Sequence, residues 1–160
     1  MNAALTAADI FRAAVLLEEK GARFYAQAAS RFKGEESKLF AGLASMELNH
    51  AGQFRAILEE LRPEEGNGPT EEKEQYLEAL TGGRIFTESE DWEDENSYED
   101  ILEKAIAVER NAVFFYTAVK ETLVREMDAE AVDRLIHEEV AHFEALSAVL
   151  RKRRGGGEGE

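Results

Sequence analysis

Apolar residues recur at alternating steps of three and four along four long stretches of the chain, the spacing of one face of an α-helix. This pattern predicts two helical hairpins, over residues 6–62 and 97–153. The first expected helix starts at Thr6 and is ended by Gly34. The other three cover about residues 35–62, 97–125 and 128–153. Together they predict an all-α protein built as a four-helix bundle.

Short polar residues mark where these helices begin. Thr6-Ala-Ala-Asp9 and Ser97-Tyr-Glu-Asp100 are capping-box sequences that open the first and third helices. Asp128 is the expected N-cap of the fourth helix. Pro63 is expected to stop the second helix, since proline lacks the backbone N–H that a helix interior needs.

Residues 63–96 have a different composition and join the two hairpins. We expect a loop, a short helix over Glu71–Leu80 closed by Gly82-Gly83, and a solvated acidic segment over residues 87–95. A connector of this length can carry the chain from one end of the bundle to the other, so the second and third helices can run parallel. Residues 1–154 are predicted to form a single domain, and residues 155–160 a flexible tail.

Six polar side chains interrupt the apolar stripes from within. They are Glu18, Glu47, His50, Glu109, Glu139 and His142. Two pairs have the form Glu-x-x-His, a spacing that puts a carboxylate and an imidazole on one helix face. A single Glu-x-x-His motif is common and says little by itself.

The two halves of the chain repeat in register, which gives the six residues more weight. Glu18 and Tyr25 return after 91 residues as Glu109 and Tyr116. The pair Glu47 and His50 returns after 92 residues as Glu139 and His142. Each hairpin thus supplies one Glu and one Glu-x-x-His, and two hairpins packed about a pseudo-twofold axis bring all six to one level of the core.

Four carboxylates crowded in a low-dielectric core repel each other and lose hydration, so they must be protonated or bind cations. Two divalent ions would neutralise four carboxylates, and neutral imidazoles would complete the ligand set. Oxygen and nitrogen donors suit iron or manganese, and zinc also fits. Tyr25 and Tyr116 either donate hydrogen bonds to ligand carboxylates or only fill the core. His137, two positions before Glu139, is expected on the surface.

Composition excludes several other functions. The net charge of −15 gives no electrostatic grip on nucleic acid or on an anionic membrane. The chain has no cysteine, which excludes disulfides, thiolate zinc sites and iron–sulfur clusters. Neither a signal peptide nor a membrane span is recognisable, so we expect a cytoplasmic protein.

At the six polar residues of the apolar stripes, the sequence resembles the ferritin-like superfamily, and within it rubrerythrin-type domains. The resemblance rests on the six ligand candidates, on Phe24-Tyr25 and Phe115-Tyr116, and on Tyr76–Leu80 in the connector. It implies a ferritin-like bundle with a di-iron centre that reacts with hydrogen peroxide or oxygen, often in a homodimer. Two departures are visible: Ala112 stands where rubrerythrins usually carry a further Glu, and the missing cysteines leave no rubredoxin iron.

Four functions follow as hypotheses. The first is reduction of hydrogen peroxide at a di-iron site, with electrons from an external donor protein. The second is a ferroxidase that oxidises ferrous iron with oxygen. The third is an iron-binding or iron-delivery module without turnover, and the fourth is a structural bundle with static zinc.

Overall fold

The computed structural model describes residues 5–61, 70–80 and 97–156. Throughout these ranges the regular structure is helical, as the sequence predicts. The helices are α1 (Ala7–Arg31), α2 (Glu35–Glu60), α3 (Glu71–Leu80), α4 (Tyr98–Lys120) and α5 (Glu126–Gly155). The expectations for Pro63, Gly82-Gly83, the acidic residues 87–95 and residues 157–160 of the tail lie outside the described ranges. Gly155, which was predicted to belong to the flexible tail, is the last residue of α5.

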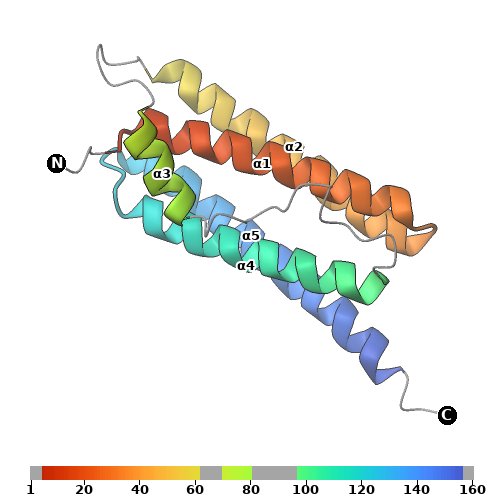
Figure 1. Ribbon diagram of the computed structural model, residues 1–160. Coiled ribbons are helices and arrows are strands. Elements are labelled where there is room, and N and C mark those ends of the chain that lie inside the picture. Colours follow the sequence, from red (N-terminus) through yellow and green to blue (C-terminus); the bar gives the residue numbers. More distant parts are fainter. Residues whose placement is uncertain (1–4, 62–69, 81–96, 157–160) are drawn as a thin grey trace.

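The four long helices form a bundle of two hairpins, α1 with α2 and α4 with α5 (Figure 1). In Figure 1, α2 and α4 both run from the right of the view to the left, so these consecutive long helices are parallel. The short helix α3 lies across the end of the bundle where α1 begins. The four-helix bundle with a long crossover and a short extra helix is therefore confirmed.

Both predicted capping boxes are present. At α1, the Asp9 backbone N–H donates to the Thr6 hydroxyl over 3.2 Å, and the Thr6 N–H donates to the Asp9 carboxylate over 2.9 Å. At α4, Ser97 and Asp100 make the same exchange over 3.0 and 3.1 Å. Each box satisfies backbone donors that the first turn of a helix leaves without partners.

The prediction that Asp128 caps the last helix was wrong. Helix α5 begins at Glu126, with Arg125 at the N-cap, and α4 ends at Lys120 rather than near Arg125. Asp128 lies in the first turn and is buried, with its carboxylate 3.3 Å from Nε of Arg125. An acid in the first turn interacts favourably with the helix dipole just as a capping acid does, so the residue type alone did not separate the two positions.

A buried ion pair ties α3 to the bundle. The ammonium of Lys73 donates to the carboxylate of Asp9 over 2.8 Å, and both side chains are buried. Leu77, one helical turn further along α3, packs against the adjacent core. The start of α1 is thus covered by the one element of the connector that the structure describes.

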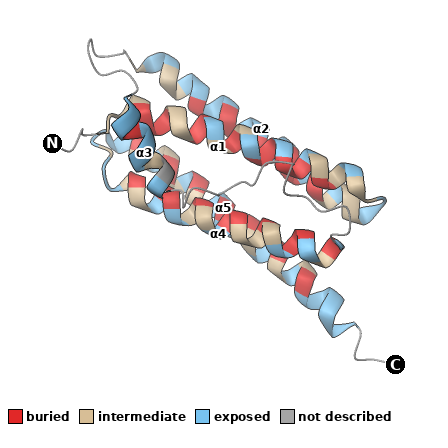
Figure 2. Cartoon of the chain, in the orientation of Figure 1, coloured by how far each residue is buried: buried red, intermediate tan, exposed pale blue. Residues whose placement is uncertain are grey.

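The buried faces of the long helices face one another in the interior of the bundle (Figure 2). Among the described residues the apolar core forms two clusters, one around Phe11, Phe54 and Phe115 and one around Phe40 and Leu146. The six polar residues of the stripes belong to neither cluster, although they are buried. None of the helices in the described ranges combines the length and the apolar character needed to cross a membrane.

Candidate metal centre

The structure brings all six predicted residues together, one or two from each long helix. Each is at most 5% exposed; Glu18 comes from α1, Glu47 and His50 from α2, Glu109 from α4, and Glu139 and His142 from α5. Their meeting follows from the stripe, because a polar residue on the inward face of each helix must point at the bundle axis.

The six side chains form two groups that share two carboxylates. The first position consists of Glu18, Glu47, His50 and Glu139, and the second position consists of Glu47, Glu109, Glu139 and His142. Within each group, one donor atom from every residue lies within 4.8 Å of the others. Glu47 and Glu139 are thus common to both positions, whereas Glu18 and Glu109 each belong to one.

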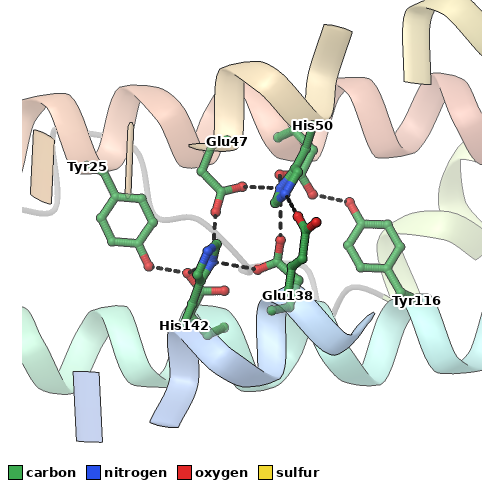
Figure 3. A network of polar contacts seen from close by, with 9 residues as sticks. Tyr25, Glu47, His50, Tyr116, Glu138 and His142 are labelled. Atoms are coloured by element: carbon green, nitrogen blue, oxygen red, sulfur yellow. Dashed lines mark hydrogen bonds and ion pairs between the residues drawn. The ribbon is translucent and has the colours of Figure 1, made fainter. Parts of the chain in front are cut away.

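In both positions the Nδ1 atom of the imidazole faces the carboxylates (Figure 3). Nδ1 of His50 lies 3.4 Å from Glu18 and 3.3 Å from Glu139. Nδ1 of His142 lies 3.6 Å from Glu109, 3.6 Å from Glu139 and 3.7 Å from Glu47. The rings are 6.0 Å apart between centroids and nearly parallel, with 24° between their planes.

Several of these inward atoms have no hydrogen-bond partner within the described part of the chain. They are Oε2 of Glu18, Nδ1 of His50, Oε1 of Glu139 and Nδ1 of His142. Nε2 of His142, on the outer side of its ring, also has no partner among the described residues. Buried polar atoms without partners are costly, and native structures almost always satisfy them. A divalent cation in each position would provide the missing interaction, so the donor set fits two metal ions.

Glu18 and Glu109, the terminal carboxylates that each belong to one position only, accept hydrogen bonds from tyrosines of the opposite hairpin. The Tyr25 hydroxyl on α1 donates to Glu109 on α4 over 2.5 Å, and the Tyr116 hydroxyl on α4 donates to Glu18 on α1 over 2.5 Å. Both rings are fully buried, and Figure 3 shows them on opposite sides of the polar layer. These hydrogen bonds cross between the hairpins and follow the same pseudo-symmetry as the sequence repeat.

In the metal-free layer, the pKa values of the histidines and carboxylates show which groups hold protons. Burial opposes protonation of the histidines, but carboxylates outweigh it: Glu139 and Glu18 raise the pKa of His50 to about 10, and Glu109 and Glu139 raise that of His142 to about 9. Burial and the neighbouring carboxylates raise the pKa values of Glu47 and Glu109 well above the usual range. Burial also raises the pKa of Glu139, but its hydrogen bonds outweigh this and lower the value overall. The cluster therefore takes up positive charge, as protons if not as metal ions.

One residue beside the layer was missed by the sequence analysis. The Nε2 atom of His50, on the far side of the ring from the layer, is hydrogen-bonded to the carboxylate of Glu138 on α5 (Figure 3). Glu138 is half exposed and lies off the apolar stripe, so helical periodicity assigned it to solvent. The only signal was its place directly before Glu139. His137 is exposed, as predicted.

A solved structure is similar over nearly the whole chain. It is a protein from Thermotoga maritima described as a ferritin-like diiron-carboxylate protein, with 25% sequence identity and a TM-score of 0.68. The match covers 93% of this chain and 97% of that chain. Together with the buried Glu and His groups, it defines the class: a ferritin-like diiron-carboxylate protein.

The family follows from the sequence. The family model described as Rubrerythrin matches residues 9–98, more than half of the chain, and the protein belongs to this family. The matched range contains Glu18, Glu47 and His50, so the first hairpin carries the family signal and the second hairpin supplies the rest of the centre. A search of curated proteins found no match.

Proposed function

We propose that the protein is a di-iron oxidoreductase that reduces hydrogen peroxide to water. The observation that carries the proposal is the sharing of Glu47 and Glu139 between two buried positions. Shared carboxylates hold two ions close enough to act on one small molecule. Two ferrous ions would supply the two electrons that, with two protons, convert one hydrogen peroxide into two waters.

The residues of the chain would hold the ions, orient the ligands and exclude bulk water. The four carboxylates neutralise two divalent ions, and each histidine offers one nitrogen to one position. Tyr25 and Tyr116 hold the terminal carboxylates in place by their hydrogen bonds. The apolar clusters on either side of the layer limit access of water to the centre.

Return of the electrons requires a second protein in this proposal. The chain contains no cysteine and hence no thiolate-ligated iron of its own. We therefore assign re-reduction to an external electron donor. We further propose that the reaction takes place in the cytoplasm and that the protein is a homodimer.

Stopped-flow absorbance on anaerobic protein loaded with ferrous iron tests the proposal. Mixing with hydrogen peroxide is expected to oxidise the iron much faster than mixing with oxygen-saturated buffer at equal oxidant concentration. Zinc-loaded protein is the control, because zinc has no redox chemistry and must give no signal. Faster oxidation by oxygen would overturn peroxide reduction in favour of a ferroxidase, and no reaction with either oxidant would leave only iron binding or delivery.

A further inference from the structure

The two metal positions differ on the outer side of their histidines. Nε2 of His50 has a carboxylate partner in Glu138, whereas Nε2 of His142 has no hydrogen-bond partner among the described residues although it is buried. We infer that Glu138 is a positioning residue that makes the first position bind a divalent ion more tightly than the second. This inference rests on the metal centre of the proposed function and goes beyond it.

The sequence repeat shows why only one histidine has this partner. The offset of 92 residues that relates α2 to α5 places Met46 in register with Glu138. A carboxylate at one site is therefore a thioether at the other. The two residues are similarly exposed, Met46 at 45% and Glu138 at 50%. Only the glutamate can accept a charge-assisted hydrogen bond from an imidazole N–H.

The contact with Glu138 prepares His50 for a metal ion. A hydrogen bond from Nε2–H fixes the tautomer, so that Nδ1 carries the lone pair. Nδ1 of His50 is the atom that faces Glu18 and Glu139, and no hydrogen bond occupies it among the described residues. A carboxylate partner also fixes the ring orientation and makes the ligand nitrogen more basic, and removing such partners typically costs about 10–100-fold in metal affinity.

His142 lacks both advantages. Its Nδ1 faces three carboxylates at 3.6–3.7 Å, comparable to the geometry at His50. Its ring, however, has no described acceptor for Nε2–H, and a buried donor without a partner is unfavourable. The inner ligands of the two positions are thus equivalent in kind, and the difference in affinity comes from the outer side.

Glu138 also remains accessible to water on one side. Because its side chain is half exposed, its charge is not fully desolvated, and the contact with His50 does not carry the penalty of a fully buried ion pair. Replacing it should therefore leave the fold intact and change the metal site, which makes it a suitable residue to mutate.

The test is a chelator-competition titration of the metal-free, full-length protein with Co²⁺ and Mn²⁺. The wild type is expected to bind two ions in steps separated by about 10–100-fold. Glu138→Ala is expected to weaken the tighter step by about that factor and to bring the two steps together. Glu138→Gln keeps an acceptor oxygen and is expected to retain part of the separation. Glu144→Gln removes an exposed acid from the same helix and serves as the matched charge control, with both steps unchanged.

Two further readouts separate positioning from a general loss of stability. Met46→Glu is expected to strengthen the weaker step, which no damage to the fold would do. In the NMR spectrum of the Co²⁺-loaded protein, one exchangeable imidazole N–H resonance is expected to be protected from exchange in the wild type and in Glu138→Gln, and lost in Glu138→Ala.

Equal steps in the wild type would overturn the inference, as would Glu138→Ala weakening both steps equally or neither. These measurements require no turnover. If the titrations succeed and peroxide does not react, the proposed function fails and the inference stands. If peroxide reacts rapidly and the two steps are equal, the reverse holds.

Discussion

The hairpin of α1 and α2 supplies Glu18, Glu47 and His50 to the polar layer, and the hairpin of α4 and α5 supplies the matching three residues. Each hairpin also sends one tyrosine across to the terminal carboxylate of the other. At the outer rim this correspondence ends, since Glu138 contacts His50 and Met46 stands at its counterpart position. A repeated sequence can thus form a centre with matching inner residues while its two halves have different outer contacts.

The largest effects are expected from the carboxylates, and they test whether the inner layer is equivalent in the two hairpins. Alanine at Glu47 or Glu139 removes a residue common to both positions, so each variant is expected to lose tight binding of both ions. Alanine at Glu18 or Glu109 removes a ligand from one position, so metal content is expected to fall from about two ions per chain toward one. Metal analysis after dialysis measures this.

Different metal contents in two corresponding variants would show that the two hairpins are not equivalent. If Glu109→Ala kept full metal content while Glu18→Ala lost it, the second position would not be a metal site. Thermal unfolding of each metal-free variant provides the control: Glu18→Ala and Glu109→Ala each remove the acceptor of one buried tyrosine hydroxyl, so the two variants should lose similar stability and both should remain folded.

A smaller effect is expected from pH on the metal-free protein. The folded-state pKa values of His50 and His142, about 10 and about 9, lie above the usual 6.5, so the folded state binds more protons than the unfolded state in this range. Stability from these groups is full below about pH 6.5 and is lost as the pH rises through about 9 to 10. Glu47 and Glu109 act in the same direction, because their pKa values are also raised.

Circular dichroism melts in the presence of a chelator should therefore show the midpoint falling by several degrees between pH 6.5 and 9.5. The metal-loaded protein should show a smaller change, because the ions replace the protons. A midpoint that stays constant or rises without metal would contradict this account of the polar layer.

The smallest effect is expected from the two tyrosines. Removing one hydroxyl at a time tests whether each tyrosine affects the metal affinity of one position only. Tyr116→Phe should weaken the first position and Tyr25→Phe the second, each by about tenfold, because a terminal carboxylate loses its donor. Phenylalanine retains the ring in its buried place, so the apolar clusters should remain packed. The Co²⁺ titration measures both variants, and equal weakening of both steps in either one would show that the tyrosines do not act on separate positions.

Sequence predicted the bundle and its six buried polar residues because both depend on helical periodicity. A carboxylate on an apolar stripe, such as Glu109, has to face the bundle axis, and the repeat placed its partners at the same level. Which carboxylates are shared could not be predicted, because that depends on the relative heights of four helices. Glu138 could not be found either, since periodicity assigns a residue to a face but does not show which exposed side chain reaches across to a neighbouring helix.

Local signals were also uneven in what they determined. Thr6 and Ser97 identified helix starts because each is followed three residues later by an acid that completes a reciprocal pair of hydrogen bonds. Asp128 has no such reciprocal partner, and an acid is favourable at several places in a first turn. A single residue preference therefore placed the N-cap of α5 three residues too late, at Asp128 instead of Arg125.

The buried Ala112 stands one turn after Glu109, where the resemblance to rubrerythrin-type domains implies a further Glu, and the polar layer contains four carboxylates. Two ferrous ions would leave that set electrically neutral, whereas two ferric ions would leave two uncompensated positive charges in a medium of low dielectric constant. Unless anions entered from solvent, the oxidised form would be the less favourable one, which would raise the reduction potential of such a centre. With iron in both positions, as proposed, the absence of a further acid there would make the oxidised centre easier to reduce.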